Sequence, residues 1–187
     1  MADHVRLFMA VNVPFPRSLQ SVMRTLDAIG RSVLTVAAET SHVTLKFLGD
    51  TNSSQLEAIE SAMKTAVAEQ SRQVIRVEQL GAFPDAERPS VIWAGLSNSN
   101  WLKELAKRLD QLLDPLGFVP ESRPYHPHLT LARIKGAPPE PLFDLMREHR
   151  QTLFGEFEVT SIELYRSELL ASGARYSVIA SHKLGCS

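Results

Sequence analysis

The chain has 187 residues, 44% of them hydrophobic and 22% charged, and its formal net charge is -1 at pH 7. This length supports one sizeable core and is short for two independent domains. Nearly balanced charge gives no broad basic surface for long nucleic acid, which favours a terminus or a nucleotide over a long duplex as a nucleic-acid ligand. The single cysteine, Cys186, allows no intrachain disulfide, and no apolar run reaches the roughly 18 residues of a membrane span. We expect a cytoplasmic protein with no membrane contact and no obligate protein partner.

Hydrophobic periodicity and turn residues predict alternating strands and helices. In chain order these are a strand over 5–13, a helix from Pro16 to Gly30, a strand over 33–36, the segment around His42, a helix capped by Asn52-Ser53-Ser54, strands over 73–80 and 90–95, a helix from Asn100 to near Pro115, the segment from Arg123, a helix over 141–150, and strands over 157–165 and 175–182.

The order of these elements repeats within the chain. Helix, strand, helix and two strands describe residues 17–95, and the same words describe residues 101–183. A repeat this long indicates two related lobes within a single domain spanning 1–187, rather than a solenoid. Strand-rich lobes with helices on one side predict an α+β fold, in which two antiparallel-sheet lobes with outer helices face each other across a central cleft.

The strongest functional signal is a pair of His-x-Thr segments, SHVTLKFLGD and RPYHPHLTLAR, at equivalent points of the repeat. Strand side chains alternate, so His42 and Thr44 share a face, as do His128 and Thr130. Two copies with the same parity have no common packing reason to keep both residue types. One neutral imidazole can accept a proton from water while a protonated one donates to a leaving oxygen, and threonine hydroxyls can donate to phosphate oxygens. The pair predicts metal-independent hydrolysis at phosphorus.

Residues beside the two motifs are candidate substrate contacts. Five positions beyond the motif histidines stand Phe47 and Arg133, a phenyl ring and a guanidinium plane that can hold a nucleobase between them. Strict alternation turns both side chains inward, so this hypothesis requires a twist or a bulge, and Phe47 in the core is the alternative. Arg123, Tyr125 and His126 precede the second motif as either substrate contacts or scaffold.

These segments, with RPSVIWAGL and the late GARYSVI, resemble the two-histidine phosphoesterases, and most closely the bacterial and archaeal RNA 2′,3′-cyclic phosphodiesterases, also called 2′-5′ RNA ligases. The resemblance covers nearly the whole chain. It implies a bilobal α+β fold and opening of an RNA-terminal 2′,3′-cyclic phosphate to a 2′-phosphomonoester, with reversible 2′-5′ ligation. It also implies that His42 is the proton donor and His128 the proton acceptor, although the residues alone leave these roles interchangeable.

The resemblance further implies that no cofactor is needed and that the substrates are RNA 3′ ends or small cyclic nucleotides. Thr44 and Thr130 are expected to hold phosphate oxygens. One departure from the family pattern is the Thr40-Ser41 dipeptide before His42, where relatives often have Asn-Leu, and it touches the entry to the motif strand.

Three other hypotheses compete with this one. His126 and His128 stand at alternate positions, as in some metal sites, yet no carboxylate or cysteine lies within the motif and the upstream copy has no second histidine. We therefore expect no metal. A non-catalytic nucleotide or RNA-end binding module on the same scaffold is a second alternative, which loss of a motif histidine would favour. Both histidines are present. The sequence has no G-x-S-x-G motif, so it gives no support to serine hydrolase chemistry.

Overall fold

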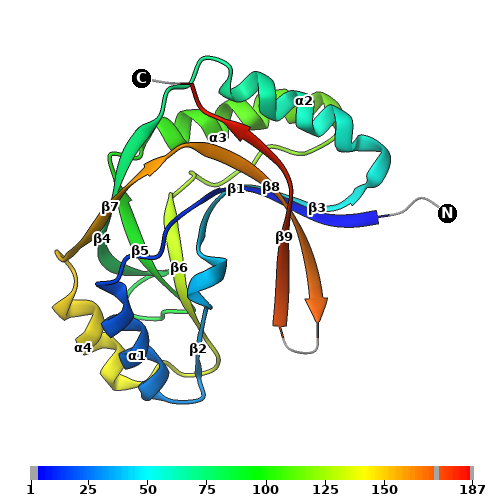
Figure 1. Cartoon of the computed structure of the whole chain (residues 1–187). Helices are drawn as coiled ribbons and strands as arrows, with labels where there is room; N and C mark the ends of the chain where they lie inside the picture. The colour runs from blue at the N-terminus through cyan, green and yellow to red at the C-terminus, as the bar shows by residue number, and fades with distance from the viewer. Residues whose placement is uncertain (1–3, 171–172, 186–187) are drawn as a thin grey trace.

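The computed structural model describes residues 4–170 and 173–185, so Cys186 lies outside the described residues. The protein is α+β, with two antiparallel sheets (Figure 1). The first sheet is four-stranded and has the order β3-β1-β8-β9, formed by β3 (His42–Asn52), β1 (His4–Asn12), β8 (Ser161–Leu170) and β9 (Gly173–Lys183). The second is five-stranded and has the order β2-β6-β5-β4-β7, formed by β2 (Val33–Thr35), β6 (His128–Ile134), β5 (Val91–Ser97), β4 (Gln73–Phe83) and β7 (Leu153–Val159).

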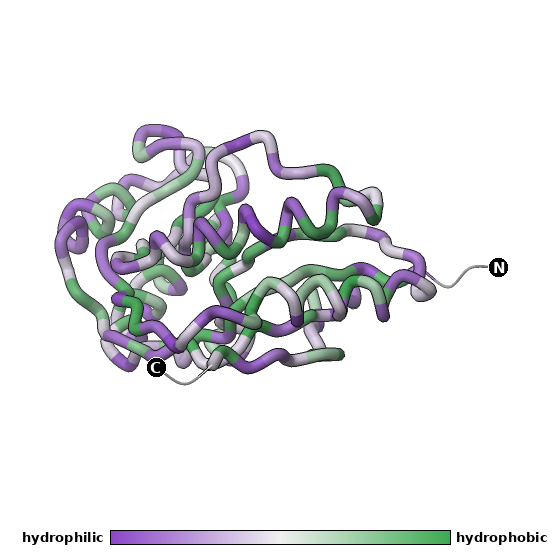
Figure 2. The backbone as a smooth tube through the Cα atoms, turned by 90° about the horizontal axis from the view of Figure 1, so that it is seen from above, coloured by the Kyte–Doolittle hydropathy of each residue, from purple (hydrophilic) through white to green (hydrophobic). Residues whose placement is uncertain are grey.

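Four helices of the described residues cover one face of each sheet. Those packed on the first sheet are α2 (Leu56–Val67) and α3 (Asn100–Leu113), and those packed on the second are α1 (Leu19–Ile29) and α4 (Glu140–Glu148) (Figure 1). Hydrophobic and hydrophilic positions alternate along each helix (Figure 2), because only the stripe that faces a sheet is buried. None of these helices is both long enough and apolar enough to cross a bilayer.

The core lies between the helices and the covered faces of the sheets. Along β1 the residues Val5, Leu7, Met9 and Val11 are all buried and face this core. The opposite face of each sheet is therefore free to carry polar side chains, and both His-x-Thr motifs use it. The α+β class with outer helices, predicted from the sequence, is confirmed.

Most predicted elements are present, but one strand was wrong. The expected strand over 157–165 is two strands, since β7 ends at Val159 and β8 begins at Ser161. β7 pairs with β4 in the second sheet, whereas β8 pairs with β1 and β9 in the first. A second difference is smaller: α1 begins at Leu19, because Pro16 opens a turn in which its carbonyl accepts from the Leu19 amide at 3.0 Å.

Each sheet combines strands from both halves of the sequence. β4 and β5 follow the first motif in the chain but pair in the sheet of the second motif. β8 and β9 follow the second motif but complete the sheet of the first. The two halves are therefore interlocked, and the surroundings of each motif histidine come partly from the other half. The assignment of one domain over 1–187 with repeats at 17–95 and 101–183 stays a prediction.

Candidate active site

The two motif strands come together where the sheets meet. β3 and β6 belong to different sheets, yet they contact each other. In each strand the histidine and the threonine are partly exposed, while the apolar residues between and beyond them are buried in the core: Val43 and Leu45 in β3, and Leu129 and Leu131 in β6. The alternation predicted from the two motifs is therefore observed, and it places the polar side chains of both strands on the faces that no helix covers.

A β-bulge follows the threonine in both motif strands. Leu45 is the extra residue in β3, between the pairs Ala10↔Thr44 and Met9↔Lys46. Leu131 is the extra residue in β6, between Trp93↔Thr130 and Ile92↔Ala132. Because a bulge shifts the alternation by one, the next outward residues are Phe47 and Arg133, on the same face as the histidines.

The bulge that the base-holding hypothesis required is thus present in both copies. Phe47 is 70% exposed, so it is not a core residue, and its ring centroid lies 5.9 Å from that of Phe8. Arg133 is exposed and, among the described residues, makes no ion pair. Lys46, which the bulge turns inward, is buried, pairs with Asp110 of α3 and donates to the Val119 carbonyl at 2.9 Å. The sandwich of a base between Phe47 and Arg133 stays a prediction.

The two imidazoles are held by the same backbone contact. His42 Nδ1 lies 2.6 Å from the Thr40 carbonyl oxygen, and His128 Nδ1 lies 2.7 Å from the His126 carbonyl oxygen. A carbonyl can only accept, so Nδ1 carries the hydrogen in both rings. Nε2 is left in each ring as the nitrogen that can exchange a proton with a ligand. Because the backbone of Thr40 makes this contact, the unusual Thr40-Ser41 dipeptide leaves it intact.

Aromatic rings surround His42. Its ring centroid lies 4.9 Å from Phe8 of β1, 5.9 Å from Tyr165 of β8 and 5.4 Å from Tyr176 of β9. Phe8 and Tyr165 are themselves stacked, with centroids 5.0 Å apart. These rings exclude water from most of the imidazole, and two of the three come from the second half of the chain.

A matching set of rings surrounds His128. Its centroid lies 4.9 Å from Phe83 of β4 and 6.5 Å from Trp93 of β5. Trp93 also packs against His126, with centroids 5.0 Å apart. Gly81 makes this possible, because a Cβ at that position would come within 2.2 Å of the Trp93 ring. Both ring clusters were missed at the level of sequence, where the aromatic residues stand far from the motifs and only strand register brings them together.

Burial lowers the pKa of both motif histidines. For His42 the only opposing effect is the hydrogen bond to the Thr40 carbonyl, which favours the charged ring. For His128 the same kind of bond to His126 opposes burial, while the positive charges of His126, Arg133 and His42 lower the pKa further. The charge on His42 therefore disfavours the charged form of His128, so the two rings lie close enough to interact.

The residues before the second motif have different surroundings. The Tyr125 hydroxyl donates to the Thr44 carbonyl at 2.7 Å, and burial raises the pKa of Tyr125. Tyr125 thus ties the entry of the second motif to the strand of the first. Arg123 is exposed, with its Nε 3.8 Å from Oε1 of Glu121. His126 is exposed and packs on Trp93, and burial together with the charge of Lys103 lowers its pKa.

The hydroxyls of Thr44 and Thr130 are available to a ligand. Across residues 4–170 and 173–185, neither hydroxyl makes a hydrogen bond to the protein. The same part of the chain has no group of three or more His, Cys, Asp or Glu side chains that could hold a metal ion. His126 and His128 approach each other, with ring centroids 6.5 Å apart, but no third His, Cys, Asp or Glu of the described residues joins them.

Comparison with known proteins assigns the family. The model of the 2′-5′ RNA ligase superfamily matches residues 15–169. The chain belongs to the 2′-5′ RNA ligase superfamily. The resemblance to two-histidine phosphoesterases, drawn from the two motif segments, is therefore confirmed, and this match includes both motif strands.

Relatives of this superfamily member are similar along most of their length. The RNA 2′,3′-cyclic phosphodiesterase of Aeropyrum pernix is 37% identical over 160 residues, which cover 84% of this chain and 90% of the relative. The RNA 2′,3′-cyclic phosphodiesterase of Aquifex aeolicus is 36% identical over 152 residues, covering 80% and 81%. Among solved structures, TT0787 of Thermus thermophilus superposes with a TM-score of 0.81 at 28% identity, covering 96% of this chain and 97% of that one.

Proposed function

We propose that the protein hydrolyses RNA-terminal 2′,3′-cyclic phosphates to 2′-phosphomonoesters by paired-histidine acid-base catalysis without a metal. The observation that carries the proposal is the matched setting of His42 and His128 on two contacting strands. In each ring Nδ1 is hydrogen-bonded to a backbone carbonyl, which leaves Nε2 for a ligand, and the charge of His42 lowers the pKa of His128. The names of the two relatives, both RNA 2′,3′-cyclic phosphodiesterases, support the same substrate class.

Two proton transfers complete the reaction. A neutral imidazole accepts a proton from water as the water oxygen attacks phosphorus, and a protonated imidazole donates a proton to the 3′ oxygen as its bond to phosphorus breaks. Thr44 and Thr130 donate hydrogen bonds to the two non-bridging oxygens, on which charge accumulates in the transition state. The parallel step, in which a ribose 5′-hydroxyl attacks phosphorus in place of water, forms a 2′-5′ linkage when the 3′ oxygen leaves, and needs no further reactant.

The electrostatics favour His128 as the base and His42 as the acid. A base has to be neutral before reaction, and the charges of His126, Arg133 and His42 all disfavour protonation of His128. For His42, burial is the only effect that lowers the pKa, so His126 and Arg133 disfavour protonation of His128 and not of His42. An anionic phosphate bound between them stabilises a protonated imidazole, so the acid takes up its proton as the substrate binds.

The pH profiles of kcat/KM and kcat should therefore differ. The acid must be protonated, so activity falls as pH rises through its pKa, and burial places that pKa below the ordinary imidazole value of 6.5 in the free protein. In the complex the phosphate raises it, so the alkaline limb of kcat lies at higher pH than that of kcat/KM. Steady-state rates from pH 5 to 9 measure both limbs, whose apparent values belong to the coupled pair. Coincident alkaline limbs would contradict proton uptake on binding.

An RNA fragment ending in a 2′,3′-cyclic phosphate tests the activity directly. Phosphorus NMR of the product is expected to show a 2′-phosphomonoester, and excess chelator is expected to leave the rate unchanged. Tight binding of the fragment without turnover would instead identify a non-catalytic RNA-end module. Activity that chelator abolishes and zinc restores would show that His126 and His128 belong to a metal site.

A further inference from the structure

The face that carries His42 continues well beyond the motif residues. Cross-strand partners lie on the same face of a sheet, and one row of partners, Phe47, Phe8, Tyr165 and Val178, crosses all four strands of the first sheet. Phe8 and Tyr165 contact the His42 ring, so the row belongs to the His42 face. Phe47 and Val178 at its two ends are 70% and 52% exposed. This row therefore forms an apolar surface beside His42.

The same face extends outward along the β8–β9 hairpin, whose outer end projects past the rest of the sheet (Figure 1). The next partners on this face are Ser167↔Tyr176 and Leu169↔Ala174. Tyr176 contacts His42, and Leu169 stands two residues beyond Ser167, or roughly 7 Å further from the histidine. Leu169 is 75% exposed, and together with Phe47 and Val178 it extends the apolar surface of this face.

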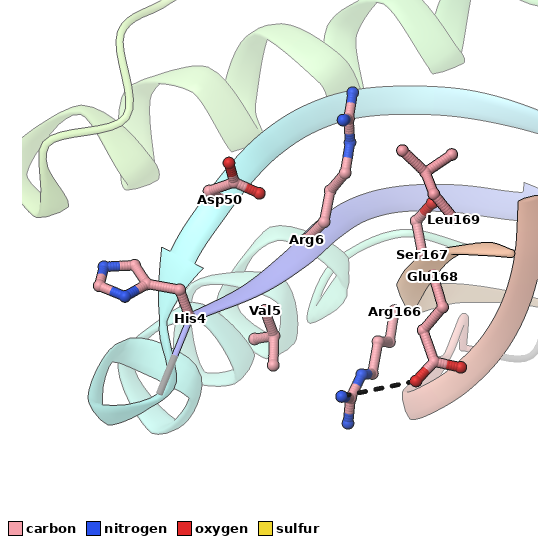
Figure 3. A pocket seen from close by; sticks show the side chains of 8 residues that line it. All are labelled: His4, Val5, Arg6, Asp50, Arg166, Ser167, Glu168 and Leu169. Carbon is pink, nitrogen blue, oxygen red and sulfur yellow. Dashed lines mark ion pairs between the residues drawn. The ribbon is translucent and has the colours of Figure 1, made fainter. Parts of the chain in front are cut away.

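A depression opens between β1 and β8 at this point (Figure 3). The two strands pair from Ala10↔Glu163 to Leu7↔Arg166 and then separate. The space beyond has a volume of about 370 Å³. Its lining residues are His4, Val5, Arg6, Asp50, Arg166, Ser167, Glu168 and Leu169. Ligand sites of small molecules begin at about this size.

Arg6 is the cation on the His42 side of this depression. It stands two residues from Phe8 on the same strand face, and Figure 3 shows its side chain pointing away from Arg166. Arg166 forms an ion pair with Glu168, in which its Nη2 lies 3.5 Å from Oε1 of Glu168. Arg6 makes no ion pair with any residue in the described part of the chain, even with Asp50, its cross-strand partner on β3. An exposed guanidinium without a carboxylate partner is available to a phosphate.

We propose that Arg6, Asp50, Ser167 and Leu169 form a second nucleotide subsite, which holds the nucleotide preceding the cyclic-phosphate end. The inference rests on the proposed function and adds the substrate class: an unpaired RNA 3′ end of at least two nucleotides. The three parts of a ribonucleotide each have a partner here, since Arg6 pairs with the phosphate, Asp50 accepts from the 2′-hydroxyl and Leu169 packs against the base. Bases of single-stranded ends can be splayed onto side chains in this way, whereas paired bases cannot.

The test compares a cyclic-ended dinucleotide with a cyclic mononucleotide. The ratio of their kcat/KM values is expected to favour the dinucleotide by roughly fivefold or more, the order expected of one base contact. Leu169→Ala and Arg6→Ala should each lower this ratio, and the Arg6 variant should also weaken its dependence on salt concentration. Leu170→Ala is the matched control, because Leu170 is the next residue, is 45% exposed and points to the opposite face.

Three outcomes separate the two proposals. A cyclic mononucleotide that is hydrolysed with no dinucleotide advantage overturns the second subsite but leaves the proposed activity standing. An equal fall of the ratio in the Leu170 control also overturns it. If neither substrate is turned over, the proposed activity fails, and the ratio of dissociation constants for the 2′-phosphorylated dinucleotide and mononucleotide, measured by calorimetry on the same variants, decides the subsite by itself.

Discussion

Replacement of His42 or of His128 by alanine is expected to lower kcat/KM for a 2′,3′-cyclic phosphate by a factor of roughly 10² to 10⁴, the usual contribution of a general acid or base. Each variant removes one Nε2 and leaves the other imidazole on its carbonyl contact. Steady-state hydrolysis of a cyclic mononucleotide measures the loss, and circular dichroism checks that the variants remain folded. The acidic limb of the pH profile should disappear with the base, and the alkaline limb with the acid.

Two further variants make the histidine experiment decisive. His149→Ala is the control, since His149 contacts Thr152 and Phe154 in the α4–β7 region and, among the described residues, makes no hydrogen bond, ion pair or ring contact with either motif strand. The double variant His42→Ala/His128→Ala should be little worse than either single variant, because groups that act as a unit are strongly non-additive. Wild-type rates in both single variants, or a double variant whose loss is the product of the two single losses, would speak against a cooperating pair.

The sequence predicted the motif strands well because their signal is local. Alternation alone placed His42 with Thr44 and His128 with Thr130, and both pairs lie on the uncovered sheet faces. The position of Phe47 was harder, since strict alternation sends it inward. Only the register with β1 shows the extra residue at Leu45 that turns it outward. A bulge is defined by the register between two paired strands, so the sequence of one strand alone does not show where it lies.

The strand expected over 157–165 was wrong for a related reason. Its residues keep a strand-like pattern through Val159, Thr160 and Ser161, and nothing local marks an end. The chain nevertheless leaves one sheet and enters the other at this point, because β7 completes the edge of the second sheet while β8 is needed beside β1. Such a change of sheet is decided by tertiary pairing, which overrides local preference.

This exchange of strands explains why the surroundings of the site could not be read from either half. Tyr165 and Tyr176 of the second half pack against His42, and Phe83 and Trp93 of the first half pack against His128. Each half therefore supplies rings that pack against the other half's histidine, and burial lowers the pKa of both histidines. Neither His-x-Thr strand has these surroundings without strands from both halves, so the proposed chemistry depends on the interlocked sheets.

Replacement of Thr44 or Thr130 by valine is expected to lower kcat by roughly 10² to 10³, the cost of removing one donor to a developing oxyanion. Valine keeps the branched shape that suits a strand, and neither hydroxyl bonds to another described residue, so the fold should not change. Serine at either position restores a hydroxyl and should recover most of the rate. Single-turnover hydrolysis of a cyclic mononucleotide measures the chemical step in all four variants.

The two threonines should also be distinguishable by the oxygen each one holds. A cyclic phosphorothioate has two diastereomers, in which sulfur replaces one or the other non-bridging oxygen and accepts hydrogen bonds poorly. If Thr44 and Thr130 each serve one oxygen, Thr44→Val should abolish the rate difference between oxygen and sulfur for one diastereomer, and Thr130→Val should abolish it for the other. Equal effects of both variants on both diastereomers would show that the hydroxyls act on the site as a whole, and a rate unchanged by valine would remove them from the mechanism.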